Sequence, residues 1–410
     1  MNILLVIGYV WPEPKSSAAG FHMLSLLRLF KRKSWRVIFA TPAKKTEFMC
    51  DLANESIETK EIKVNDSEFD SYVSELSPTA VLFDRFLMEE QFGWRVAEHS
   101  PSSFRILDTE DLQSLRGARH QALKENRQFC LDDLDSDLAK RELASIYRSD
   151  LNLIISEFEM NLLKEKFGLH DELIHHTPFM VEPSELDSST LSFEERAHFV
   201  TIGNLRHAPN WDSILYLQEL WPNIKKELPE AELHIYGAYT PPKATALNNP
   251  KQGFLIKDRA DDVFRVMKNA RVCLSPLRFG AGIKGKFIDA MKVSTPCITT
   301  SIGSEGMMAK GSWPGYVEDE QDKLVQSAVE LYSDKDLWTK MSLRGHSLLK
   351  SKYNSRTIGE SLYQKVEQGI NNLVKLRKKN FIGQMLQHHQ MQSTKFMARW
   401  IEEKNNKLEK

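Results

Sequence analysis

Short apolar runs alternate with segments of helical periodicity along most of this chain, and this alternation limits its fold more than any other feature. An apolar run over residues 2–7 is followed by helical spacing over 19–33 and by a second apolar run over 35–40. This strand, helix, strand order is typical of the right-handed crossover unit of a parallel sheet. The same pattern predicts strands at 80–83, 104–107 and 151–156, with helical regions at 89–98 and 117–149.

A second set of such units begins at residue 198. The polar stretch at 186–197 lacks a sustained period and is predicted to link the two sets. With 410 residues, 41% of them hydrophobic, the chain is long enough for two α/β domains, which we expect at 1–185 and 198–340. The strands of the second domain are predicted near 199–203, 233–236, 254–256, 271–277 and 296–301.

Charge and cysteine content exclude several classes of protein. The formal net charge of -1 at pH 7 argues against a polyanionic partner for the chain as a whole. The four cysteines are far apart and form no Cys-x-x-Cys pair, so a reducing cytoplasm is the expected location. No apolar run approaches the length of about eighteen residues that a membrane span needs. The opening segment has no basic n-region, which indicates a first strand and not a signal peptide.

The stretch at 275–291 combines a strand end, a glycine-rich loop and a helix start. Glycine lets backbone N–H groups approach a ligand closely, and a helix N-terminus favours negative charge. Cations in the same loop would neutralise that charge. This combination predicts a cradle for a phosphate or diphosphate. The residues concerned are Gly280, Gly282 and Gly285, with Arg278, Lys284 and Lys286.

Asp289 follows Lys286 by three positions, so both lie on one face of the predicted helix at 282–293. A cation there suits a phosphate, and a carboxylate suits sugar hydroxyls. A second glycine-bearing turn at 302–306 follows the next predicted strand, which places two such loops at the sheet edge where open α/β sheets bind ligands. The alternative interpretation is an ordinary glycine turn with solvated lysines and a local ion pair.

These residues resemble a known family. The segment Leu-Arg-Phe-Gly-Ala-Gly-Ile-Lys-Gly-Lys-Phe-Ile-Asp-Ala-Met at 277–291, with Thr-Pro-Cys-Ile-Thr-Thr and Gly-Ser-Glu-Gly after it, is similar to the donor-site signature of the family 4 (group 1) retaining glycosyltransferases. The resemblance covers about residues 198–306 well and the first half more loosely. It implies the GT-B fold, in which two Rossmann-like parallel-sheet domains face across a cleft and helices at 341–374 cross back to the first domain.

The resemblance also implies roles for residues of the second domain. A nucleotide-diphosphate sugar would bind there without a metal or other cofactor, and its sugar would be transferred with retention, by front-face attack assisted by the leaving phosphate. Asp289 would bind the ribose, and Glu305 with Gly306, at the start of a second helix, would bind near the ribose or diphosphate. The groups implied to hold the diphosphate and stabilise the leaving group are Arg278, Lys284 and Lys286, with Arg206, Gly203, Gly280 and Gly282 as further donor contacts.

Two positions depart from the family's pattern. Many members carry Glu eight residues before the acidic position that Asp289 occupies, and Ala281 stands there in this chain. The usual residue at position 289 is itself Glu, so a shorter carboxylate replaces it. A protein that binds nucleotide sugars without transferring them is the alternative function that these departures favour.

Polar residues at predicted strand ends mark the acceptor side of the first half. Asp84 and Asp108 each end a predicted strand, and carboxylates at this edge bind hydroxyls or act as a general base. Asp108 is therefore a candidate catalytic residue, and Asp111 is a candidate acceptor contact. The competing interpretation is a helix N-cap at Asp108 or Thr109, with Glu110 and Asp111 in the first turn.

The loop at 16–20 precedes a helix and is open to two interpretations. It is an ordinary N-cap, or it contacts the diphosphate and acceptor, as the corresponding loop does in the resembled family. The candidate contacts are Ser16, Ser17 and Gly20. Where members often carry His near the Asp-Thr-Glu-Asp-Leu block, this chain has Gln113, so the acceptor-side chemistry stays open.

Residues 375–410 combine nine Lys or Arg with three Glu and with interspersed apolar residues. Such a basic amphipathic helical tail binds an anionic membrane or nucleic acid, or it packs on the protein body or on a second copy. Peripheral attachment at the inner face of a membrane, nucleic-acid contact and oligomerisation are therefore all open.

The sequence thus predicts a cytoplasmic glycosyltransferase that moves a sugar from a nucleotide sugar to an acceptor hydroxyl. The expected acceptor is a glycan or a lipid-linked saccharide. The alternative acceptor is a macromolecule, RNA or protein, that the basic tail would hold.

Overall fold

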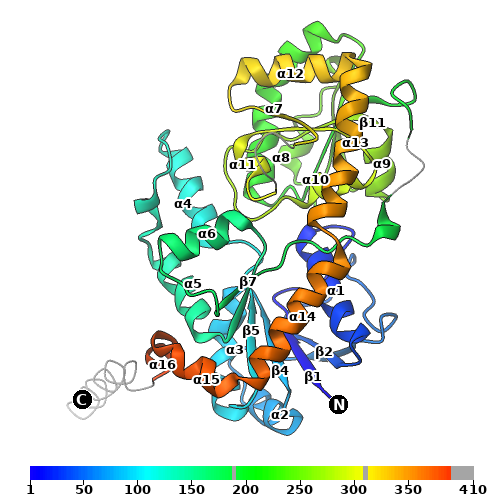
Figure 1. Cartoon of the computed structure of the whole chain (residues 1–410). Helices are drawn as coiled ribbons and strands as arrows, with labels where there is room; N and C mark the ends of the chain where they lie inside the picture. Colours follow the sequence, from blue (N-terminus) through cyan, green and yellow to red (C-terminus); the bar gives the residue numbers. More distant parts are fainter. Residues whose placement is uncertain (187–190, 308–312, 389–410) are drawn as a thin grey trace, which may run out of the picture.

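The computed structural model describes residues 1–186, 191–307 and 313–388. Two α/β lobes are stacked, each around its own parallel sheet, and helices of the C-terminal region run from the second lobe back along the first (Figure 1). This is the predicted fold class of two parallel-sheet domains with a helical C-terminal region. Residues 187–190 of the predicted linker and 389–410 of the predicted tail lie outside the described residues.

The first lobe is built on seven parallel strands in the order β3-β2-β1-β4-β5-β6-β7. Strands β4, β5 and β6 are buried along their whole length, as expected for a parallel sheet with both faces covered. The edge strand β3 has only exposed polar side chains, so hydrophobic patterning did not predict it. The bounds are β1 (Ile3–Ile7), β2 (Arg36–Thr41), β3 (Glu58–Glu61), β4 (Ala80–Asp84), β5 (Phe104–Asp108), β6 (Leu151–Ile154) and β7 (Ile174–His176).

Two of the helices of the first lobe begin at serine N-caps, Ser17 and Ser136. The helical region predicted at 117–149 is two helices, because the first ends at Lys124 and Ser136 caps the second by accepting the N–H of Ala139 at 3.2 Å. A 3₁₀ turn at Leu131–Leu134 lies between them. The bounds are α1 (Ala18–Arg32), α2 (Glu68–Leu76), α3 (Arg85–His99), α4 (Gln113–Lys124), α5 (Asp137–Arg148) and α6 (Glu157–Glu165).

The second lobe is built on six parallel strands in the order β10-β9-β8-β11-β12-β13. Its glycine-rich loop is longer than the sequence suggested, because the strand before it ends at Leu274 and the helix after it begins only at Gly285. The strands are β8 (Ala197–Ile202), β9 (Leu233–Tyr236), β10 (Phe254–Lys257), β11 (Ala270–Leu274), β12 (Cys297–Thr299) and β13 (Gly315–Val317). The helices are α7 (Ala208–Glu227), α8 (Pro242–Thr245), α9 (Val263–Asn269), α10 (Gly285–Lys292), α11 (Ser301–Ser304) and α12 (Gln321–Ser333).

The C-terminal helices join the two lobes. Helix α13 (Lys335–Lys352) lies on the second lobe, and α14 (Ser355–Asn371) runs along the first (Figure 1). Helix α14 buries Ile358, Leu362 and Val366 in the hydrophobic core under β1, β2 and α1. Two short helices follow, α15 (Leu373–Lys379) and α16 (Phe381–Gln387).

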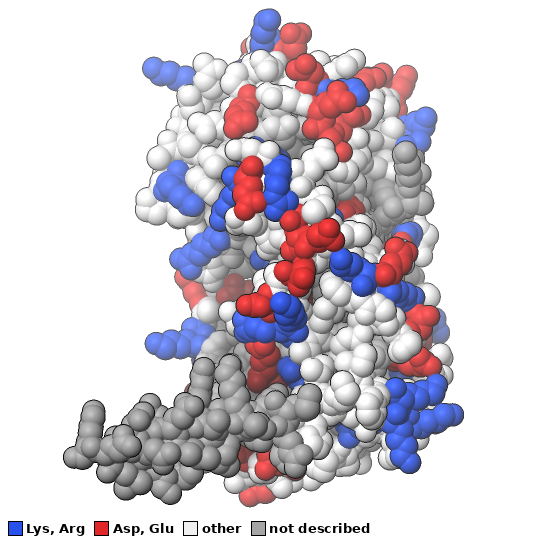
Figure 2. All heavy atoms as spheres, turned by 90° about the vertical axis from the view of Figure 1, so that its left-hand side faces the viewer, with Lys and Arg blue, Asp and Glu red and all other residues white. Residues whose placement is uncertain are grey.

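The surface carries both signs of charge. Acidic and basic side chains are interspersed over the face that Figure 2 shows, in keeping with the formal net charge of -1. Within the described ranges, no helix is both long and apolar enough to cross a membrane.

Candidate active site

The glycine-rich loop between β11 and α10 lies at the carboxyl edge of its sheet, facing the first lobe. Gly282 adopts a left-handed backbone with φ of 63°, and a Cβ there would lie 3.0 Å from the Cβ of Asp111. Glycine at this position therefore serves both the turn and the close approach of the two lobes. The ammonium group of Lys284 donates to the Gly282 carbonyl at 2.8 Å.

Lys284 and Lys286 are held at the same helix start without a hydrogen bond to a carboxylate. Lys286 Nζ donates to the amide oxygen of Asn210 at 2.9 Å, and Asn210 belongs to α7. Burial lowers the pKa of both lysines to about 8, while Glu305 acts in the opposite direction on Lys284. An anion bound here would favour the charged form of both groups, which is the behaviour expected of a phosphate site.

Two further cations of the predicted donor set are held by other partners. Arg278 pairs with Asp212 of α7, with Nε–Oδ2 and Nη2–Oδ1 distances of 3.0 and 2.6 Å. Arg206 is exposed, and its guanidinium carbon lies 4.6 Å from the centre of the Tyr239 ring. Both side chains would have to leave these contacts to reach a diphosphate.

Asp289 lies one turn beyond Lys286 on α10 and is partly buried. Burial raises the pKa of its carboxyl to about 6, while Lys292 lowers the pKa and Glu185 raises it further. Gly203, a further glycine assigned to the donor, packs against the Asn210 amide, because a Cβ there would lie 2.6 Å from the amide nitrogen.

The sequence predicted Glu305 at the start of a helix, and this prediction is wrong. Thr300 caps α11 by accepting the N–H of Gly303 at 3.2 Å, so the helix occupies Ser301–Ser304 and Glu305 follows its end. The Glu305 carboxylate instead accepts two hydrogen bonds from Arg119 of α4, both at 2.7 Å. The pair joins the two lobes.

Other contacts close the same interface. Arg119 also donates to the Gly280 carbonyl at 2.8 Å. The fully buried Glu159 of α6 accepts the N–H of Gly282 at 2.8 Å, and burial raises its pKa to about 8. A Cβ on Gly306 would lie 2.1 Å from the hydroxyl of Ser156. The glycine loop therefore fits closely against the first lobe, and sequence reasoning missed Arg119 and Glu159 because their partners are more than a hundred residues away.

The first lobe presents buried acids at the facing edge. Asp84 and Asp108 are in register at the ends of β4 and β5, as the sequence predicted for a shared crevice. Asp84 accepts the N–H of Tyr9 at 2.9 Å, and Asp108 accepts the N–H of Glu110 at 3.3 Å. The predicted N-cap at Asp108 or Thr109 is wrong, because α4 begins only at Gln113 and Glu110 has a left-handed φ of 59°.

His22 completes this buried group. Its Nε2 lies 3.8 Å from Oδ1 of Asp108, and it is the one ionisable residue on the buried face of α1. Among the described residues, neither ring nitrogen has a hydrogen-bond partner, and the same holds for Oδ1 of Asp84, Oδ2 of Asp108 and Oε1 of Glu110. Burial and neighbouring carboxylates raise the pKa of Asp108 and of Glu110 to about 8, and burial lowers the pKa of His22. The sequence did contain one signal for this buried group, because His22 falls on an otherwise apolar face of the first helix.

The remaining acceptor-side candidates line the same interface. Burial would raise the pKa of Asp111, but its ion pair with Arg116, at 2.7 Å, lowers it overall. Ser17 caps α1 by accepting the N–H of Gly20 at 3.0 Å, so its N-cap interpretation is confirmed. The hydroxyl of Ser16 lies 3.5 Å from Nε of Arg259 in the second lobe.

One group away from this interface has the composition of a metal site. Among the described residues, His198, Glu232 and His234 bring three such side chains together. The distance between His234 Nε2 and Glu232 Oε2 is 2.7 Å. The group lies at the amino ends of β8 and β9, at the sheet edge opposite the glycine loop, so it is separate from the candidate active site.

Comparison with known proteins agrees with this geometry. Residues 196–334 match the family described as Glycosyl transferases group 1. An uncharacterized 44.6 kDa protein in the cps region of Klebsiella pneumoniae is 24% identical over 233 residues, so the match spans 55% of this chain and 58% of that protein. Sucrose-phosphate synthase from Thermosynechococcus elongatus superposes with a TM-score of 0.68 at 13% identity, over 90% of this chain and 99% of that one.

The Anabaena protein HepE, whose structure is a complex with UDP and glucose, superposes with a TM-score of 0.67 at 10% identity. The superposition covers 90% of this chain and 100% of that one. The chain therefore has the GT-B fold, and its second domain matches the group 1 glycosyl transferases.

Proposed function

We propose that the protein transfers a sugar from a nucleotide-diphosphate sugar to an acceptor hydroxyl. The observation that carries this proposal is the pair Lys284 and Lys286 at the start of α10, beside the left-handed Gly282. Two cations and a helix N-terminus at one point suit a diphosphate, which becomes the leaving group. The UDP bound by the similar Anabaena protein makes uracil the first base to test.

The donor lies mainly on the second lobe in this proposal. Lys284 and Lys286 hold the diphosphate and stabilise its developing negative charge, a task that a metal ion performs in other enzymes. Asp289 binds the ribose. The reaction proceeds with retention, because the acceptor attacks from the face that the phosphate leaves and transfers its proton to that phosphate.

The acceptor lies against the first lobe. The orphaned polar atoms of His22, Asp108 and Glu110 are buried at the facing edge, and a buried polar group without a partner is costly unless a ligand or water binds it. Acids and imidazole at one point suit the hydroxyls of a saccharide. A free or lipid-linked saccharide is therefore the proposed acceptor.

A thermal-shift panel of UDP-, GDP-, ADP- and CMP-sugars, followed by a donor-hydrolysis assay, tests the proposal. A ligand at a hundredfold excess over its Kd adds about 2.7 kcal/mol of stability, which raises the Tm measurably. One stabilising donor that is also hydrolysed is the expected outcome. Stabilisation without hydrolysis, even with saccharide acceptors added, would favour the non-transferring sugar-binding protein instead. No stabilisation by any of the four would contradict the proposal.

A further inference from the structure

Helices α15 and α16 expose an unusual amount of apolar surface. The exposed fractions are 70% for Val374, 66% for Phe381, 46% for Ile382 and 43% for Met385. These side chains fall within two successive short helices at the end of the first lobe farthest from the second (Figure 1). Exposed apolar side chains grouped in this way mark an interaction surface more often than scattered ones do.

Cations accompany the apolar side chains. Lys375 and Lys378 are exposed, and neither forms an ion pair with any described residue. Arg377, by contrast, anchors the helix, because its guanidinium donates to Asp150 at 2.8 Å and to the Ser103 carbonyl at 2.7 Å. The position of α15 is therefore fixed while two of its lysines remain available.

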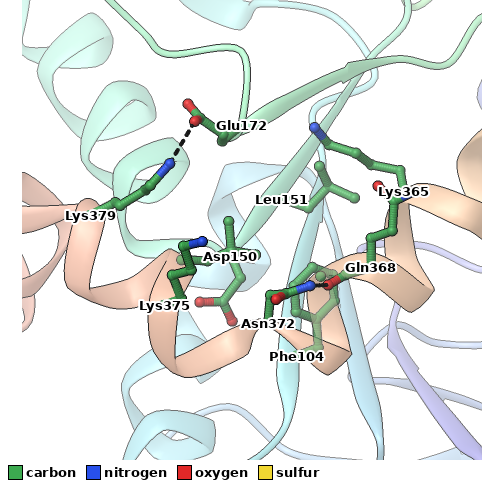
Figure 3. A pocket seen from close by; sticks show the side chains of 11 residues that line it. Phe104, Asp150, Leu151, Glu172, Lys365, Gln368, Asn372, Lys375 and Lys379 are labelled. Carbon is green, nitrogen blue, oxygen red and sulfur yellow. Dashed lines mark hydrogen bonds and ion pairs between the residues drawn. The ribbon is translucent and has the colours of Figure 1, made fainter.

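A pocket of about 270 Å³ opens beside Lys375, between α14, α15 and the starts of β5 and β6 (Figure 3). Phe104 and Leu151 belong to its apolar part. The two acidic residues of the lining are both paired, because Lys379 Nζ lies 3.0 Å from a carboxylate oxygen of Glu172, and Arg377, which is outside the lining, pairs with Asp150. The lining therefore keeps an excess of positive charge. That excess comes from Lys365 and Lys375.

The pocket is not part of the candidate active site. Phe104 and Leu151 begin β5 and β6, whereas Asp108 ends β5 and faces the second lobe. In a parallel sheet these are opposite edges, so a ligand at one does not contact a ligand at the other.

We propose that α15 and α16 form a docking surface for an anionic membrane. Phe381, Ile382 and Val374 enter the boundary between headgroups and acyl chains, while Lys375 and Lys378 meet lipid phosphates and the pocket accepts a headgroup. Two features favour this occupant over a second copy of the chain or a nucleic acid. The excess positive charge would repel an identical surface, and exposed aliphatic side chains gain nothing from a phosphate backbone.

Sedimentation of the full-length protein with vesicles tests the proposal. One set contains phosphatidylcholine alone, and the other contains equal amounts of phosphatidylcholine and phosphatidylglycerol. We expect binding to the second set only, weakened by added salt. Lys375→Ala should lower the affinity roughly fivefold, because a lysine near an anionic surface contributes about 1 kcal/mol. Phe381→Ser should lower it roughly tenfold or more, because an inserted aromatic side chain is lost.

Matched controls come from α13 on the second lobe. Leu343 is 67% exposed and Lys340 is also exposed, so Leu343→Ser and Lys340→Ala change the same kinds of side chain elsewhere. Both should bind as the unchanged protein does, and melting temperatures check that every variant folds. All variants retain residues 389–410, so a loss in Lys375→Ala or Phe381→Ser identifies the described surface.

Four results would overturn the proposal. The first is absence of binding to the phosphatidylglycerol vesicles. The second is equal binding by all four variants, which would place the contact elsewhere in the chain. The third is a dimer in size-exclusion chromatography that Phe381→Ser dissociates, which would make the surface an interface between two copies. Full competition by soluble glycerol phosphate would likewise show that the pocket takes a free phosphate and not a lipid.

Discussion

The two lobes present opposite chemistry at their facing edges. The second lobe offers Lys284 and Lys286 on a glycine loop, partly exposed and ready for an anion. The first lobe offers His22, Asp108 and Glu110, which are buried and have several polar atoms without a hydrogen-bond partner in the described part of the chain. The half-buried basic edge suits a charged donor that arrives from solvent. The fully buried acidic edge keeps its carboxyl groups protonated until a hydroxyl or a water molecule binds there.

Two contacts join these edges directly. Arg119 and Glu305 cross from one lobe to the other with exposed side-chain fractions of only 6% and 15%. Glu159 accepts a hydrogen bond from the N–H of Gly282, which would otherwise be free to donate to a phosphate of the donor. Closure of the lobes and binding of the donor therefore use some of the same groups, which the following predictions separate.

The largest effect is expected for Arg119→Ala. Removing one partner of a mostly buried pair leaves Glu305 without compensation and should lower the free energy of unfolding by about 3 kcal/mol. Denaturant unfolding measures the loss. Arg141→Ala is the control, because Arg141 pairs with Glu90 at the surface with 52% of its side chain exposed, and about 1 kcal/mol or less is expected there. Similar losses in the two variants would mean that the interlobe pair contributes little to closure.

Lys286→Ala should have the next largest effect, and it acts on the donor side alone. Loss of a charge-assisted hydrogen bond to phosphate should weaken binding of the donor by about 1.5 to 3 kcal/mol, which is roughly 10- to 150-fold in Kd. Calorimetric titration with the donor that the thermal-shift panel selects measures the change. Lys340→Ala, on the exposed face of α13, should leave the Kd unchanged. An unaltered Kd in Lys286→Ala would show that this loop is not the phosphate cradle.

Asp108→Asn tests the acidic edge through the pH dependence of stability. The pKa of Asp108 is raised to about 8 in the folded protein, above its ordinary value of 3.8. The folded state therefore binds more protons than the unfolded state between these values, and this carboxyl contributes stability that is lost as the pH rises toward 8. The free energy of unfolding should fall by up to about 1.4 kcal/mol per pH unit for this proton, and the slope should be shallower in Asp108→Asn.

The difference between the unchanged protein and Asp108→Asn is the quantity to measure, from about pH 5 to pH 8. The lowered pKa of His22 acts with the opposite sign near 6.5, and the comparison removes it. Asp137→Asn, whose side chain is 97% exposed, serves as a control with an unchanged slope. Parallel curves for Asp108→Asn and the unchanged protein would contradict the buried, protonated carboxyl.

Arg278→Ala should have the smallest effect. Its pair with Asp212 is one third exposed on the arginine side, so its loss should cost about 1 kcal/mol or less in the free energy of unfolding. The Kd for the donor should rise less than in Lys286→Ala, because Asp212 already occupies the guanidinium. An equal rise in both variants would mean that Arg278 leaves Asp212 to bind the diphosphate, as the family resemblance implies.

Several features of this protein follow from its sequence alone. The strand Ala80–Asp84 is a buried, mostly apolar run, so it could be predicted almost to the residue. The strand Leu233–Tyr236 buries only alternate side chains, and a pattern of period two predicted it equally well. The glycine loop was also predictable, because its glycines and cations are close in the sequence. The polar strand Glu58–Glu61 was not, since its place is fixed by pairing with β2 and not by burial.

Tertiary structure alone decided how the candidate site is assembled. Arg119 reaches Glu305, Glu159 reaches Gly282 and His22 reaches Asp108 only because two lobes and distant strands meet at one edge. The same packing pairs Arg278 with Asp212 and places Glu305 after a helix instead of at the start of one. Local sequence determines which segments become strands, helices and turns. The partner of each charged side chain depends on contacts between segments far apart in the chain, which no local pattern records.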